Sequence, residues 1–135
     1  MKELTIELTN KCQLCCPWCS SACGIVPLVE DINMSFAHVK HILDNNFKDG
    51  FTHVRFSGGE PTLNENLGDC IDYAKRTGYH VTLLTNGIIK YFHTGIDKIE
   101  VHWTGEDNAP VLISYVRWLQ GACDVKISIN VVSIK

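Results

Sequence analysis

The sequence contains no stretch that approaches the roughly 20 consecutive apolar residues needed to cross a membrane as a helix. Its first residues alternate apolar and polar side chains and lack the apolar centre of a secretory signal. Positive charge is not in excess either, since 12 basic and 15 acidic residues give a formal net charge of −3. These absences predict a cytoplasmic protein without a membrane partner, and they give no electrostatic reason to expect nucleic acid.

The chain also lacks internal repeats, low-complexity tracts and long linkers. With 135 residues, 45% of them hydrophobic, it can bury one apolar core and has little room for a second domain. We therefore expect residues 1–135 to form a single domain. Cysteine, by contrast, is plentiful, with seven residues in total and four between positions 12 and 19. In a reducing compartment such a cluster more often binds metal or does redox chemistry than forms disulfides.

Strand and helix patterns alternate along the chain. The periodicity predicts helices that begin near Ser35, Leu67 and Asn108, with a further one left open near Ile88. It predicts strands over 4–8, 53–56, 79–84, 96–103 and 125–134. This alternation is typical of an α/β fold, here an open partial (βα) barrel of about five parallel strands in sequential order, with helices on one face. In such sheets the chemistry lies at the carboxyl ends of the strands.

The expected helix ends follow from caps. Ser35 is predicted to cap the first helix, and Gly78 to end the second in a left-handed conformation. Asn108 is predicted to cap the third helix and Gly121 to end it, with Val111 among the residues that face inward.

Cys12, Cys16 and Cys19 have the spacing Cys-x3-Cys-x2-Cys. Three thiolates at this spacing can bind three irons of a cubane cluster, which leaves the fourth iron without a protein ligand. An open metal position can bind a small molecule, as open zinc positions do in catalytic sites. The triad therefore predicts a [4Fe–4S] cluster with one accessible iron.

Cys15 leaves an alternative open. Together with Cys12, Cys19 and Cys23 it makes four cysteines, which would suit a closed cluster in an iron–sulfur electron carrier or a zinc-binding structural module without catalysis. That alternative gives no role to the glycine-rich segment after the second predicted strand. We favour the triad and expect Cys15 and Cys23 to be unligated thiols.

Three segments resemble the radical S-adenosylmethionine (radical SAM) superfamily. Residues 8–19 read Leu-Thr-Asn-Lys-Cys-Gln-Leu-Cys-Cys-Pro-Trp-Cys, which matches the spaced triad with an aromatic residue before its last cysteine. Residues 57–61, Ser-Gly-Gly-Glu-Pro, resemble the second hallmark, a Gly-Gly-Glu motif. Residues 85–87, Thr-Asn-Gly, resemble a frequent third signal. The chain is thus identified as a short member of this superfamily.

The resemblance implies that the cluster binds S-adenosylmethionine (SAM) and cleaves it reductively to a 5′-deoxyadenosyl radical that abstracts hydrogen from a substrate. It implies that Trp18 backs the cluster loop, with its backbone against the adenine, and that Gly58, Gly59 and Glu60 hold the methionine moiety. It also implies an external one-electron donor. The substrate is not readable, but a short open barrel leaves a wide cleft, which favours a peptide or protein substrate or completion of the cleft in a homo-oligomer.

Several polar residues share the face of the last two predicted strands that should point away from the helices, among them His102, Ser128 and Asn130. Two interpretations stay open: these residues line the cleft and contact SAM, as inward residues do in the family, or they form a solvated polar face. Asn86, in the third motif, is also expected at the SAM site. No residue that acts on the substrate itself can be named.

A few residues carry simpler expectations. Cys70, on the apolar face of the second helix, and Cys123, before the last strand, are predicted to be small structural hydrophobes. His38 and His41 are predicted to lie on the surface. For Arg55 two roles are equally open, binding of a substrate anion or a salt bridge on the sheet.

Overall fold

The computed structural model describes residues 2–10, 33–103, 109–122 and 125–131. Its elements, in order, are β1 (Glu3–Glu7), α1 (Phe36–Lys48), β2 (His53–Ser57), the 3-10 helix η1 (Pro61–Leu63), α2 (Leu67–Thr77), β3 (His80–Thr85), β4 (Lys98–Trp103), α3 (Ala109–Ala122) and β5 (Lys126–Val131). The predicted alternation of strands and helices is therefore confirmed. The short helix η1 was not predicted.

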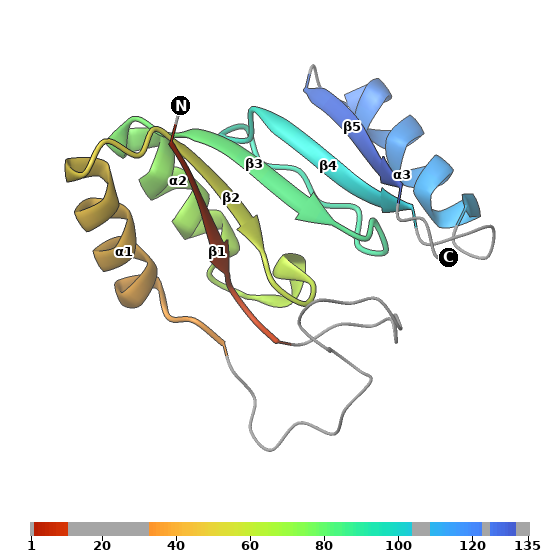
Figure 1. Cartoon of the computed structure of the whole chain (residues 1–135). Helices are drawn as coiled ribbons and strands as arrows, with labels where there is room; N and C mark the ends of the chain where they lie inside the picture. The colour runs from red at the N-terminus through yellow and green to blue at the C-terminus, as the bar shows by residue number, and fades with distance from the viewer. Residues whose placement is uncertain (1, 11–32, 104–108, 123–124, 132–135) are drawn as a thin grey trace.

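The strands form one open parallel sheet in the order β1-β2-β3-β4-β5, which runs across Figure 1 from red to blue. In the register, Ile6 lies beside Phe56, and Phe56 beside Leu83. Right-handed crossovers between neighbouring parallel strands place successive helices on the same side. Figure 1 shows α1 and α2 packed on the same face of the sheet, and α3 lies against β4. The predicted fold class is thus confirmed.

The two faces of the sheet differ in polarity because alternate strand residues point in opposite directions. Helix-facing side chains such as Phe56, Leu83 and Val101 are fully buried and form one core with the inward stripes of the three α-helices. The other face carries polar residues, which include His53, Arg55, Ser57, Lys98, Glu100, His102, Lys126 and Ser128. A sheet buried on both faces would need apolar residues in both sets, so this sheet keeps one open polar face.

The helix ends agree with the sequence for the first two helices. The Ser35 side chain accepts a hydrogen bond from the His38 amide at 3.2 Å, and Gly78 ends α2 with φ of +119°. The expectations for α3 were wrong in two details. The helix continues through Gly121, whose φ is not positive, to Ala122. Val111 is exposed because Leu112, Tyr115 and Leu119 form the buried stripe; Asn108 lies outside the described residues.

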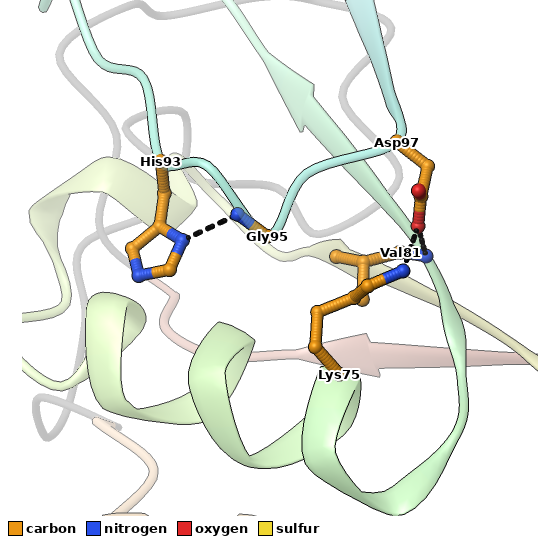
Figure 2. A network of polar contacts seen from close by, with 5 residues as sticks. All are labelled: Lys75, Val81, His93, Gly95 and Asp97. Carbon is orange, nitrogen blue, oxygen red and sulfur yellow. Dashed lines mark hydrogen bonds and ion pairs between the residues drawn. The ribbon is translucent and has the colours of Figure 1, made fainter.

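The chain between β3 and β4 forms no helix near Ile88, and polar contacts hold it against α2 (Figure 2). The Asp97 carboxylate accepts hydrogen bonds from the Lys75 ammonium and the Val81 amide, both at 2.8 Å. Nearby, the His93 Nδ1 accepts from the Gly95 amide at 2.9 Å. The Asp97 contacts thus join this segment, which has no regular secondary structure, to both α2 and β3.

Asp97→Asn is expected to lower the free energy of unfolding by about 1 kcal/mol at neutral pH, since a charge-assisted contact becomes a neutral one. Burial acts to raise the pKa of Asp97, but the hydrogen bonds from Lys75 and Val81 and the nearby positive charge outweigh it, so the pKa is lowered. A lowered pKa contributes stability above the unfolded value that is lost as pH falls through the folded value. Thermal unfolding from pH 7 down to about pH 3 should therefore show the difference disappear with acid. The exposed Glu65→Gln is the control, and a pH-independent difference would contradict this explanation.

Candidate functional site

Parallel strands place their carboxyl ends at one edge of the sheet, and two of the sequence motifs meet there. The Glu60 carboxylate, just after β2, accepts a hydrogen bond from the Thr85 hydroxyl at 2.6 Å and from the Asn86 amide at 2.8 Å, at the end of β3. It also accepts from the Thr62 hydroxyl. The Gly-Gly-Glu and Thr-Asn-Gly segments are thus joined through one carboxylate.

Glu60 is buried, with 1% of its surface exposed. Burial raises the pKa of its carboxyl group above the ordinary value, and the hydrogen bonds from Thr62, Thr85 and the Asn86 amide act in the opposite direction. Among the described residues its Oε1 accepts only the Asn86 hydrogen bond. A carboxylate oxygen can accept more than one hydrogen bond, so this atom retains capacity for a further donor.

The two glycines bring the end of β2 against the chain that follows β1. Gly58 has φ of +128°, and a Cβ there would lie 2.6 Å from the Thr9 carbonyl oxygen. The Gly59 amide donates to that same oxygen at 2.7 Å, and the Leu8 amide donates to the Ser57 carbonyl at 2.9 Å. Glycine is therefore required at position 58 to fix the chain that leads into the cysteine segment.

Asn86 hydrogen-bonds Glu60 through its backbone amide and stabilises the following turn through its side chain. Its side-chain oxygen accepts a hydrogen bond from the Ile88 amide at 3.0 Å, and the residue is 8% exposed. The next residue, Gly87, has φ of +79°, and a Cβ there would lie 3.1 Å from the Tyr115 ring of α3. The third motif is thus a tight turn between the buried carboxylate and α3.

The open face of the sheet holds the remaining predicted residues. Arg55 forms an ion pair with Glu100, so the salt-bridge alternative for Arg55 is what the structure contains. Lys98 lies 3.3 Å from the same carboxylate. Burial, and then the Arg55 charge, lower the pKa of His102, while Glu100 opposes the shift.

His102 pairs in register with Asn130, and Glu100 with Ser128. The described residues therefore place His102 and Ser128 on the predicted polar face. The side chain of Asn130 lies outside the described part of the chain, although its backbone belongs to β5.

The predicted metal ligands Cys12, Cys16 and Cys19 lie outside the described residues, as do Trp18 and the other cysteines at positions 15, 23 and 123. In the ranges that the structure does describe, no three His, Cys, Asp or Glu side chains converge in a way that could hold a metal ion.

Cys70 is fully buried in the core, which confirms its structural role, and burial raises the pKa of its thiol to about 12. His38 and His41 are exposed, as expected.

No sequence pattern indicated Asn64, which donates hydrogen bonds to Leu8 and Met34, on either side of residues 11–32, the cysteine segment. A polar residue just before a predicted helix is ordinarily interpreted as a cap, and that interpretation hides a contact 56 residues away along the chain.

Of the helices in the described ranges, none is long and apolar enough to cross a membrane.

Comparisons with known proteins agree with the motifs. The PqqA peptide cyclase of Xanthomonas oryzae pv. oryzae (strain MAFF 311018) is 34% identical over 86 residues, which cover 64% of this chain and 23% of that protein. The PqqA peptide cyclase of Streptomyces rochei is 34% identical over 85 residues, with 63% and 23% covered. This chain therefore spans about a quarter of the length of these relatives.

Two solved structures share the fold. BtrN in complex with AdoMet and 2-DOIA superposes with a TM-score of 0.71 at 20% identity, covering 96% of this chain and 56% of that one. Archaeal TYW1 gives a TM-score of 0.59 at 15% identity, covering 99% and 56%. A family model, the radical SAM superfamily, matches residues 6–117, a range that includes all three motifs. This chain belongs to the radical SAM superfamily.

Proposed function

We propose that residues 1–135 are the cofactor-binding core of a radical SAM enzyme, with Cys12, Cys16 and Cys19 as ligands of a [4Fe–4S] cluster. The observation that carries this proposal is the junction at the carboxyl edge, where Glu60 joins two motifs and Gly58 and Gly59 hold the chain leading to the triad. The donor chemistry fits, since thiolates are the usual ligands of such clusters. A bound, reduced cluster would supply one electron to break the C5′–S bond of SAM, which would release methionine and a 5′-deoxyadenosyl radical able to abstract hydrogen from a substrate.

The chain's own residues would hold and orient SAM. The Gly58–Gly59 backbone and Glu60 would bind its methionine end, where Glu60 Oε1 has acceptor capacity for the ammonium group. Trp18 would lie behind the cluster with its backbone near the adenine. The residues that would contact the ribose and carboxylate from the neighbouring strand ends are Asn86, His102, Ser128 and Asn130.

A peptide is the substrate class that the relatives favour, because the matched proteins are PqqA peptide cyclases. The open polar face of the sheet suits a peptide. An external one-electron donor would reduce the cluster.

Adding SAM to the anaerobically reconstituted and reduced protein tests the proposal. A cluster with an open iron is expected to change its electron paramagnetic resonance spectrum when SAM binds. A closed four-cysteine cluster that uses Cys15 and Cys23 would keep its spectrum, and a zinc module would give none. Either of those results would contradict the proposal.

Glu60→Gln is expected to weaken SAM binding while leaving the iron content unchanged. A charge-assisted hydrogen bond contributes about 1.5–3 kcal/mol, which corresponds to a loss of affinity of roughly tenfold or more. The fold should survive, because glutamine can accept from the Asn86 amide through its oxygen and donate to the hydroxyl groups of Thr62 and Thr85, so that only the long hydrogen bond from the Thr62 amide, at 3.4 Å, is lost.

The measurement is a titration of the cluster spectrum with SAM, with Glu65→Gln as the matched control. Glu65 lies five residues further along and is exposed, so the same chemical change there should leave the affinity as it is. Equal SAM affinity in Glu60→Gln and Glu65→Gln would remove Glu60 from the SAM site.

A further inference from the structure

Asn64 lies outside the three sequence motifs, and all the polar atoms of its side-chain amide form hydrogen bonds. Its Nδ2 donates to the Leu8 carbonyl at 3.0 Å and to the Met34 carbonyl at 3.1 Å. Its Oδ1 accepts from the Asn66 amide at 2.8 Å. The residue is 3% exposed, so both carbonyls are satisfied away from bulk solvent.

The two carbonyls belong to opposite ends of one chain segment. Leu8 precedes residues 11–32 and Met34 follows them, and the Met34 amide donates to the Leu8 carbonyl at 2.8 Å. Thr9 and Asn33 form an antiparallel bridge beside this contact. The chain therefore leaves the sheet and returns to it at the same point, and Asn64 is hydrogen-bonded to both ends.

Asn64 is also connected to the Gly-Gly-Glu motif. The short helix η1 begins directly after Glu60, and the Asn64 amide donates to the Pro61 carbonyl at 3.0 Å to end it. The short helix η1 thus links the buried carboxylate of Glu60 to the Asn64 amide, which is hydrogen-bonded to both ends of the cysteine segment. Only asparagine offers two donors and one acceptor on so short a side chain.

We propose that Asn64 is a positioning residue for the cluster, because it fixes the ends of the segment carrying Cys12, Cys16 and Cys19 relative to Glu60. The inference rests on the proposed function, since that segment is where the cluster would bind. Closing a segment of this length costs conformational entropy. The two hydrogen bonds from Asn64 to Leu8 and Met34, which we call the clamp, would hold the ends of the segment together before the cofactor binds and so keep its ligands near the SAM-binding backbone.

Asn64→Asp tests the inference. The aspartate keeps the size and the acceptor for the Asn66 amide, but when ionised it donates to neither carbonyl. Amide hydrogen exchange of the protein as purified is the first readout and needs no cluster. The Met34 amide is expected to exchange about tenfold faster or more, whereas the core amides of Phe56 and Leu83 should change little. Equal acceleration of all three would mean general destabilisation, and no acceleration at Met34 would mean no clamp; either overturns the proposal.

The second readout is the electron paramagnetic resonance spectrum of the reconstituted protein. Asn64→Asp should still bind iron. Its electron paramagnetic resonance signal in the presence of SAM should be broader than that of the wild type, and its SAM affinity should be lowered about tenfold. Asn66→Asp is the matched control, since it adds the same charge two residues away, at the cap of α2, where the Asn66 side chain makes no capping hydrogen bond. An unchanged SAM response in Asn64→Asp would refute the positioning role. If the wild-type protein itself shows no SAM response, the proposed function fails, and the Met34 exchange still decides whether the clamp exists.

Discussion

Replacing any one of Cys12, Cys16 or Cys19 by alanine is expected to abolish stable incorporation of a four-iron cluster and, with it, SAM cleavage. In the proposed triad, each substitution would remove the sole protein ligand of one iron. Cys15→Ala and Cys23→Ala should leave the cluster largely intact. Iron and sulfide content after anaerobic reconstitution, together with the cluster absorption, measure the effect.

The control for this series is Cys70→Ala. Cys70 is buried in the core, so its replacement should cost about 1 kcal/mol of unfolding free energy through lost packing and leave the iron content unchanged. If Cys15→Ala loses the cluster while Cys16→Ala retains it, the ligand set is the four-cysteine alternative and the triad assignment is wrong.

Gly58→Ala is expected to destabilise the fold by about 2–4 kcal/mol. At φ of +128° an L side chain is strained, and its Cβ would lie 2.6 Å from the Thr9 carbonyl oxygen and 3.0 Å from the Thr9 nitrogen. These neighbours are backbone atoms, so the clash cannot be relieved by a side-chain rotation. The end of β2 would separate from the chain that leads to the triad, and iron binding should fall together with stability. Chemical denaturation of the purified protein measures the loss.

Gly121→Ala provides the opposite expectation. Nothing lies within 4 Å of a Cβ at Gly121, and the residue is inside α3 with a φ that is not positive. Alanine has a helix propensity better than that of glycine by up to about 1 kcal/mol, so this variant should be slightly more stable than the wild type.

Equal stability of Gly58→Ala and the wild type would show that the close approach to Thr9 is not needed.

Much of the fold could be predicted from the sequence because local signals and long-range packing agree. Alternation in β4 and β5 placed Glu100, His102 and Ser128 on one face, and the sequential parallel order followed from helix crossovers on one side. The prediction failed where glycine propensity competed with helix continuation, as at Gly121.

For the candidate site, the sequence could predict which residues take part but not how they contact one another. The sequence pointed to Gly58 and Glu60, but not to the hydrogen bonds from Thr62 and Thr85 that surround the Glu60 carboxylate. The contact of Asn64 with Leu8 joins residues far apart in the chain, and no local periodicity encodes it. Motif spacing indicates which groups are present, whereas their contacts depend on how the strand ends meet.

The most direct test of the central claim is anaerobic incubation of the reconstituted protein with SAM and a strong one-electron reductant, with 5′-deoxyadenosine and methionine quantified. Both products are expected to form in equal amounts, and neither is expected to form with Cys16→Ala or without the reductant. A protein that carries an intact four-iron cluster and binds SAM, yet yields no 5′-deoxyadenosine, would contradict the assignment of this chain as a radical SAM enzyme core.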